Sequence, residues 1–181
     1  MVDLAKVKRL AEIMAIWGKF ISQLGLAKKR PQYIRNLKER DLADVLRIER
    51  EMYDYPWSEE IFRDCLRVDY SNWGLIKDEK FIGYAVLSIA VGEAHVLNIC
   101  LDKEYTGQGL GEYFLNELLL VAKEQSADCV FLEVRLSNTV ATSLYKKMGF
   151  KEIGQRKNYY QAADGREDAL VFSLDLPIET S

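Results

Sequence analysis

The sequence LNICLDKEYTGQGLG, residues 97–111, decides the fold of this chain. An apolar stretch typical of a strand runs into an acidic turn, and a loop with three glycines then opens onto an amphipathic helix that starts near Gly111. Gly107, Gly109 and Gly111 allow the backbone to turn sharply and to approach a ligand closely, because they carry no Cβ. The helix directs its unpaired N–H groups and the positive end of its dipole at the same place. This order of strand, glycine loop and helix predicts a binding site for an anion, most often a phosphate.

Hydrophobic patterns on both sides of the loop predict an α+β fold, with a mixed, mostly antiparallel sheet flanked by helices. Antiparallel hairpins come first, then one strand–helix–strand unit through the loop, and then a closing hairpin. Helices are expected after Asp41, from Ser58 to about Leu66, from near Gly111, and from Asn138 to Met148, with Asp41 and Ser58 as N-caps. The expected strands are 33–37, 73–76, 81–91, 94–101, 129–134, 151–160 and 167–174.

The charge distribution divides the chain into a basic N-terminal segment and an acidic body. Residues 1–36 carry eight basic and two acidic side chains, so the rest of the chain carries a net charge of −9 within the total of −3. We therefore predict a basic amphipathic extension and linker over residues 1–32, and one domain over residues 33–178. The acidic body suits a basic substrate and argues against a DNA-binding face. The extension could pack on the domain or a partner, or attach to a membrane surface or to ribosomal RNA.

Composition excludes several other classes of protein. No apolar run approaches the ~18 residues that suggest a transmembrane segment. The three cysteines are odd in number and lack paired spacing, which is typical of reduced thiols in a cytoplasmic protein. A metal site is not expected, because the chain has one histidine, His95, and no paired cysteines.

The spacing of the glycines argues against the common nucleotide sites. Glu133 follows the loop by about 20 residues, as the ribose-binding acid of a dinucleotide site would. The loop, however, reads GxGxG rather than GxGxxG, antiparallel strands precede it, and no GK[ST] tripeptide is present to form a P-loop. A glycine-rich turn without a ligand remains an alternative, although three alternating glycines at a helix start are entropically costly.

Residues 105–111, YTGQGLG, resemble the acetyl-CoA pyrophosphate loop of the GNAT N-acetyltransferases. Further motifs resemble one subfamily, the RimI-type ribosomal-protein alanine N-acetyltransferases, and the resemblance covers residues 34–176. These motifs are PWSE at 56–59, LNI at 97–99, LEVR at 132–135, SN at 137–138, LY at 144–145, MGF at 148–150, NYY at 158–160 and GREDA at 165–169. The resemblance implies a GNAT acyltransferase fold that binds acetyl-CoA as co-substrate. Thr106 departs from the family pattern, which has glutamine or arginine there.

The resemblance implies a set of residues that bind acetyl-CoA. Backbone groups of Ile99, Cys100 and Leu101 are expected to pair with the pantetheine arm, as a short added strand would. Asn138 is expected to contact the cofactor, although it could also be a plain N-cap of the helix that it precedes. The pyrophosphate is expected on Gly107, Gln108, Gly109, Leu110, Gly111 and Glu112.

Glu133 and Tyr145 are the candidate catalytic residues. Glu133 lies in an otherwise apolar strand, where desolvation makes a carboxylate a better base, but it could equally form a buried pair with Arg135 on the same strand face. Tyr145 shares its helical spacing with core residues, so packing is the alternative to a role as the acid. The resemblance implies that Glu133 accepts a proton from the amine and that Tyr145 protonates the leaving thiolate. With pKa values of ~10 for tyrosine and ~8.5 for a thiol, that transfer is uphill by about 2 kcal/mol.

The function implied is transfer of acetyl from acetyl-CoA to the N-terminal alanine of a small-subunit ribosomal protein. The partner would then be a basic N-terminal peptide, and residues 1–30 could dock on the ribosome or on another partner. Two alternatives remain open from the residues. The same fold could acetylate lysine side chains or a small amine, and Thr106 would fit an acyl-CoA-binding module without enzymatic activity.

Overall fold

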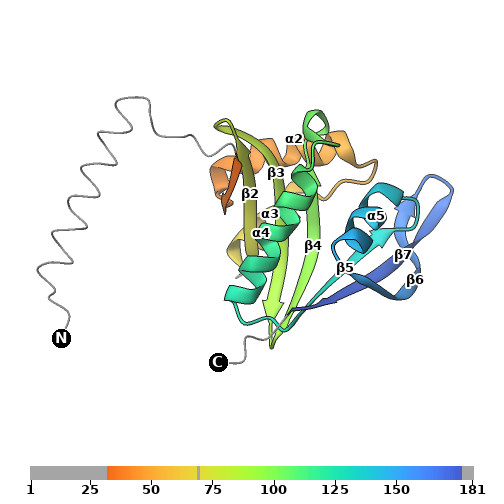
Figure 1. Ribbon diagram of the computed structural model, residues 1–181. Helices are drawn as coiled ribbons and strands as arrows, with labels where there is room; N and C mark the ends of the chain where they lie inside the picture. The colour runs from red at the N-terminus through yellow and green to blue at the C-terminus, as the bar shows by residue number, and fades with distance from the viewer. Residues whose placement is uncertain (1–31, 69, 177–181) are drawn as a thin grey trace, which may run out of the picture. The chain divides into compact units, whose positions relative to one another are not determined.

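A computed structural model describes residues 32–68 and 70–176 of the chain. The described residues form one seven-stranded sheet with the strand order β1-β2-β3-β4-β5-β7-β6 (Figure 1). The strands are β1 (Gln32–Asn36), β2 (Ser71–Lys77), β3 (Lys80–Ala90), β4 (Glu93–Leu101), β5 (Cys129–Arg135), β6 (Lys151–Ala162) and β7 (Gly165–Asp175).

The predicted mixed topology is confirmed. β4 and β5 are parallel neighbours, whereas every other neighbouring pair in this sheet is antiparallel. Parallel neighbours need a long crossover connection, which a helix usually supplies. Here the connection contains the glycine loop and α4 (Leu110–Glu124). The glycine loop is therefore placed at the end of β4, next to the one parallel pair of the sheet.

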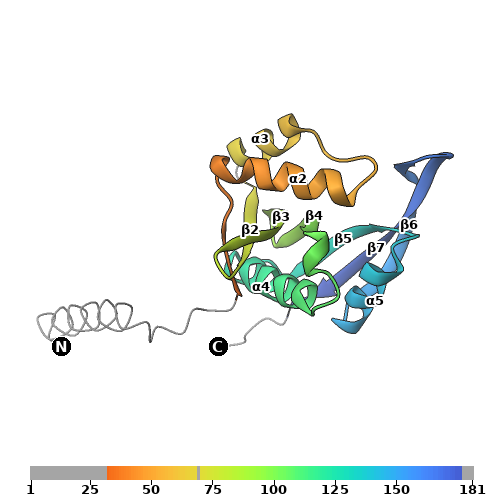
Figure 2. The same cartoon turned by 90° about the horizontal axis from the view of Figure 1, so that it is seen from above.

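Helices cover both faces of the sheet, as Figure 2 shows. On one face lie α2 (Leu42–Met52) and α3 (Glu59–Arg67), and on the other lie α4 and α5 (Thr139–Lys147). Short 3-10 turns at Glu39–Asp41 and Lys103–Tyr105, η1 and η2, precede α2 and the glycine loop. Each predicted helix of the domain is therefore present within about two residues of its expected start.

The domain has two hydrophobic cores, one on each face of the sheet, and alternate side chains of β3 pack into each of them. Tyr84 and Val86 are buried against the residues of α2 and α3, while Ala85 and Leu87 belong to the core under α4. Successive side chains of a strand point to opposite faces, so one strand can serve two apolar layers. A strand that is buried on both faces reads as a continuous apolar run, which is what residues 81–91 show.

The predicted helix ends are correct in position, but two of the predicted N-caps do not form the expected bonds. Neither Asp41 nor Ser58 makes a side-chain capping bond to the helix that it precedes. The Asp41 carboxylate instead accepts two hydrogen bonds from the Arg35 guanidinium, at 2.6 and 2.9 Å. It also accepts the Lys38 N–H at 2.9 Å, and these stronger, charge-assisted partners displace the capping bond. Gly149 follows the predicted helix end at Met148 and has a φ of +91°, the left-handed conformation that glycine supplies after a helix.

The predicted N-terminal extension lies outside the described residues, apart from Gln32 at the start of β1. The division into residues 1–32 and 33–178 therefore stays a prediction. Among the helices that the structure describes, none has the length and apolar character needed to cross a membrane.

Candidate active site

The site is built where β4 and β5 separate. The two strands pair from Glu93 to Val96 and from Cys129 to Leu132, and beyond these residues their pairing ends. β4 continues along β3 to Leu101, with Leu97 as an extra, bulged residue in the register. The edge of β4 that faces β5 is therefore free of strand pairing after Val96. A bulge of this kind bends a strand and re-aims its backbone groups.

A cleft of about 150 Å³ lies in the gap between the two strands. Four structural elements besides β4 and β5 contribute side chains to it: α2, the loop that follows α2, α5 and β6. The lining residues are Glu49, Tyr53, Tyr55, Trp57, Val96, Leu97, Asn98, Ile99, Leu132, Glu133, Val134, Arg135, Asn138, Ala141, Tyr145 and Tyr160. Both candidate catalytic residues thus face the same cavity.

Glu133 sits on β5, and its side chain is 15% exposed. The carboxylate pairs with the Arg156 guanidinium of β6 at 3.1 Å. The alternative expectation that Glu133 pairs with Arg135 is wrong. Arg135 instead binds Glu167 at 3.0 Å, and its guanidinium lies over the Tyr160 ring. The side chain of Arg156 is 55% exposed, so solvent screens its pair with Glu133 and leaves the carboxylate accessible from the cleft.

Tyr145 lies on α5, and its side chain is buried against the aromatic rings of Phe150 and Phe172. Burial raises the pKa of Tyr145 to about 12, because the phenolate would lose its hydration. The hydroxyl is therefore a stable proton donor at neutral pH, but a weaker acid than an exposed tyrosine.

Two of the three glycines in the loop have the sharply turned backbone that the sequence predicted, whereas Gly111 lies within the first turn of α4. Gly107 and Gly109 have φ values of +71° and +76°, and Gly109 is the N-cap of α4. No atom lies within 4 Å of a Cβ built at either position, so the backbone conformation, rather than a lack of space, requires glycine. No side chain caps the first turn of α4, so its N–H groups are available to an anion.

The side chains of this loop are bonded within the protein. The Thr106 hydroxyl donates to the Lys103 carbonyl at 2.9 Å, and the Gln108 amide donates to the Glu104 carbonyl at 2.8 Å. Glu112 pairs with Lys147 of α5. An anion at this loop would therefore meet backbone N–H groups, and a longer side chain at position 106 is not required for that contact.

The other residues expected to bind the cofactor are divided between the cleft and the core. Ile99 and Asn138 line the cleft, and the Asn138 side chain also caps α5 by accepting the Ala141 N–H at 3.1 Å. Cys100 and Leu101 lie on the same strand but do not line the cleft, so only their backbone groups could act there. Burial raises the pKa of the Cys100 thiol to about 12, so this thiol is a core residue rather than a nucleophile.

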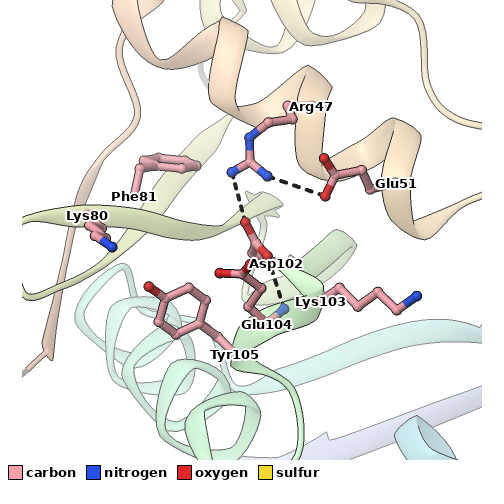
Figure 3. A pocket seen from close by; sticks show the side chains of 8 residues that line it. All are labelled: Arg47, Glu51, Lys80, Phe81, Asp102, Lys103, Glu104 and Tyr105. Carbon is pink, nitrogen blue, oxygen red and sulfur yellow. Dashed lines mark hydrogen bonds and ion pairs between the residues drawn. The ribbon is translucent and has the colours of Figure 1, made fainter.

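The domain has two further cavities. A groove of about 360 Å³ shares Tyr53, Tyr55, Arg135 and Asn138 with the cleft and extends towards the β6–β7 turn. A second, open pocket of about 610 Å³ lies between α2, the start of β3 and η2, as Figure 3 shows. In this second pocket Arg47 of α2 bridges Glu51 and Asp102, the latter at 2.8 Å, and so ties α2 to the turn before the glycine loop (Figure 3).

The sequence interpretation missed Glu49 and Arg156, whereas Tyr160 belongs to the NYY motif that it named. Glu49 lines the cleft from α2, and the Tyr160 hydroxyl donates to the Glu133 carbonyl at 3.1 Å. Glu49 had a detectable signal, because it occupies an apolar position of the helix, seven residues after Leu42. Arg156 reaches the site through the pairing of β6 with β7, which a local pattern cannot reveal.

Fold and cleft together define an acyltransferase of the GNAT type. The model of the acetyltransferase (GNAT) family matches residues 42–150. The chain therefore belongs to the GNAT acetyltransferase family, and by class it is an N-acetyltransferase.

The particular relatives agree with the RimI-type resemblance. The chain is 36% identical over 143 residues to the ribosomal protein bS18-alanine N-acetyltransferase of Escherichia coli K12, covering 79% of this chain and 97% of that protein. The crystal structure of the E. coli ribosomal-protein-S18-alanine N-acetyltransferase superposes with a TM-score of 0.75 at 34% identity, covering 83% and 98% of the two chains. A GNAT family acetyltransferase from Elizabethkingia anophelis, solved with acetyl-CoA bound, shares the fold with a TM-score of 0.67 at 21% identity, covering 82% and 100%.

Proposed function

We propose that this chain transfers acetyl from acetyl-CoA to the N-terminal alanine of a small-subunit ribosomal protein, the bS18 type on which its relatives act. The observation that carries the proposal is the cleft at the β4–β5 separation, because Glu133, Tyr145 and the unpaired edge of β4 all lie on it. The relatives named for this reaction are matched over nearly their whole length. A ribosomal substrate also implies a cytoplasmic protein.

The residues present fit acetyl-CoA. Backbone N–H groups from Gly107 to Glu112, at the uncapped start of α4, would hold the pyrophosphate. The unpaired edge of β4 from Leu97 to Leu101 would hydrogen-bond the amides of the pantetheine arm, as in strand addition. Acetyl-CoA supplies the acetyl group as a reactive thioester.

In this proposal Glu133 is the base. Its carboxylate takes a proton from the α-amine, directly or through one water, as the amine attacks the thioester carbonyl. An α-amine has a pKa of ~7.7–8.0 and is partly neutral at pH 7, whereas a lysine amine has a pKa of ~10.4. A carboxylate base is therefore matched to an N-terminal substrate better than to a lysine side chain.

Tyr145 serves the leaving group in the same proposal. Its buried hydroxyl donates a hydrogen bond to the departing sulfur, and this bond strengthens as the sulfur gains charge. A backbone N–H on the free edge of β4 stabilises the negative charge that develops on the thioester oxygen. Both substrates are present together, so the acetyl group moves directly to the amine.

The groove next to the cleft gives the peptide a path. It lies between the loop after α2 and the β6–β7 turn, and Asp54 and Glu167 are among its lining residues. Carboxylates at this mouth suit a basic peptide, in keeping with the acidic body of the chain. Glu167 already binds Arg135, so Asp54 is the carboxylate more open to a substrate.

The experiment is a peptide panel with purified protein and acetyl-CoA, read by mass spectrometry. The panel contains peptides with a free N-terminal alanine, the same peptides with a blocked N-terminus and an internal lysine, and free polyamines. Acetylation of the α-amine alone supports the proposal, and acetylation of lysine or polyamine alone would assign the cleft to the alternative substrates.

The role of Glu133 is tested by Glu133→Gln, which should lower kcat at least about 100-fold, the usual contribution of a general base. Glu152→Gln is the matched control, since Glu152 is a carboxylate of β6 that pairs with Lys146 and does not line the cleft. An unaltered rate in Glu133→Gln would remove Glu133 from the mechanism. Deletion of residues 1–30, followed by co-sedimentation with ribosomes, tests the proposed docking of that segment.

A further inference from the structure

A buried carboxylate lies on the cleft that the mechanism above does not use. Glu49 is 1% exposed, because it lies on the same inward face of α2 as the apolar residues Val45 and Ile48. Burying an ionised carboxylate is costly unless hydrogen bonds compensate for the lost water. Burial raises the pKa of Glu49, while three hydrogen bonds lower it in part.

The three hydrogen bonds come from three different parts of the fold. The Trp57 backbone N–H donates to Glu49 Oε1 at 2.7 Å, and the Tyr84 hydroxyl of β3 donates to Oε2. The Asn98 side chain, next to the bulge in β4, is the third partner. One carboxylate therefore joins α2, the loop after α2, and the two central strands.

The bond to Trp57 restrains the loop that forms one wall of the cleft. Residues 53–58 follow α2 without regular secondary structure, and Tyr53, Tyr55 and Trp57 of this loop line the cleft. The Tyr53 hydroxyl reaches the Ile99 carbonyl only at 3.5 Å, at the limit of a hydrogen bond. The 2.7 Å bond from Trp57 to Glu49 is the stronger restraint, and it is protected from water.

We propose that Glu49 is a positioning residue for the peptide: its buried carboxylate holds the loop of residues 53–58 against β4 and so fixes the wall that the N-terminal residue of the substrate contacts. This inference rests on the proposed function, because the wall matters only if a peptide enters the cleft. The negative charge of Glu49 is not required for this role. The length of the side chain and an acceptor oxygen facing Trp57 are what the loop requires.

Two conservative substitutions separate length from charge. Glu49→Gln keeps the length and one acceptor oxygen for Trp57, while its amide group can donate to the Tyr84 oxygen. Glu49→Asp keeps the charge but withdraws the carboxylate by one methylene. We expect Glu49→Asp to raise the KM for an alanine peptide about tenfold, the effect of losing roughly 1.4 kcal/mol. We expect Glu49→Gln to stay within about threefold of wild type, and the KM for acetyl-CoA to stay within about twofold in both variants.

Tyr84→Phe is the matched control, because it removes the donor to the other carboxylate oxygen and leaves the Trp57 bond intact. It should lower thermal stability without changing the peptide KM. A raised peptide KM in Glu49→Gln with an unchanged one in Glu49→Asp would overturn the proposal in favour of a charge effect, and an equal rise in the two variants would overturn it in favour of a general disturbance of the loop. Equal increases in both KM values, or none in Glu49→Asp, would overturn it as well.

A second measurement does not depend on acetylation. Hydrogen exchange of the Trp57 amide, followed by NMR, should be slow in wild type, Glu49→Gln and Tyr84→Phe, and about tenfold faster in Glu49→Asp. If the wild type acetylates no alanine peptide, the proposed function fails, while this exchange pattern still decides whether Glu49 holds the loop. Rapid exchange of Trp57 in the wild type would refute the restraint itself.

Discussion

Tyr145→Phe is the perturbation with the best-defined expected magnitude. Burial raises the pKa of Tyr145 to about 12, so full proton transfer to a thiolate with a pKa near 8.5 is uphill by roughly 3.5 units, or about 5 kcal/mol. Such a cost disfavours Tyr145 as a free acid that protonates an already separated thiolate. It favours a hydroxyl that hydrogen-bonds the sulfur while the carbon–sulfur bond breaks.

The expected loss follows from that hydrogen bond. A hydrogen bond to a charged group contributes about 1.5–3 kcal/mol, so Tyr145→Phe should lower kcat roughly 10- to 150-fold. The KM for acetyl-CoA should change by less than about twofold, because the bond strengthens only as the sulfur gains charge. Phenylalanine keeps the ring that packs on Phe150 and Phe172, so the variant should fold.

The assay is the initial rate of thiol release between pH 7 and pH 10.5. Because the folded tyrosine keeps its proton until about pH 12, the ratio of wild-type to variant kcat should be constant over this range. A wild-type kcat that falls through a pKa near 10, with no such fall in Tyr145→Phe, would show that the buried hydroxyl does not keep its proton over this range. A variant with the full wild-type rate would refute any role for the hydroxyl.

Three further outcomes are expected. Gly109→Ala should lower thermal stability by about 1 kcal/mol and raise the KM for acetyl-CoA, because alanine is strained at a φ of +76°. Gly154→Ala on exposed β6, where φ is not positive, is the control and should change neither quantity. Arg47→Met should lower the free energy of unfolding, measured in urea, by about 1–2 kcal/mol, because the Asp102 carboxylate, which is 10% exposed, loses its cation. Arg67→Met breaks an exposed ion pair and should change the free energy of unfolding by less than about 0.5 kcal/mol. Between pH 10 and pH 12 the tyrosine loses its proton in the unfolded chain and keeps it in the folded one, so the free energy of unfolding falls as pH rises. Between pH 8 and pH 11 the free energy of unfolding of wild type should fall by about 1 kcal/mol more than that of Tyr145→Phe.

The helices and strands could be predicted from the sequence because the local sequence patterns agree with the topology of the folded domain. The glycine loop between an apolar strand and an amphipathic helix placed the β4–α4–β5 crossover, and the turn at residues 77–80 placed the β2–β3 hairpin. Capping bonds were less predictable. Asp41 has the right residue type and position for a cap, but Arg35 of β1 is a stronger partner, and only the folded chain brings the two together.

The site could be predicted where its residues lie in short motifs, and not where they come from distant strands. Glu133 and Tyr145 belong to such motifs and reach one cleft. Proximity along β5 offered Arg135 as an alternative partner of Glu133, but the fold brings Arg156 of β6 to this carboxylate and pairs Arg135 with Glu167. Glu49 could have been noticed as an acid at an apolar helix position, but its three partners required the tertiary structure.

A peptide acetylation assay decides whether Glu133 and the cleft of this chain acetylate an N-terminal alanine. Purified full-length protein, acetyl-CoA and a basic peptide with a free N-terminal alanine and an internal lysine are incubated together, and the product is sequenced by tandem mass spectrometry. We expect a single acetyl group on the α-amine, formed with release of one thiol per peptide, and a rate at least about 100-fold lower in Glu133→Gln. Acetylation confined to the lysine, or an equal rate in Glu133→Gln, would contradict this expectation.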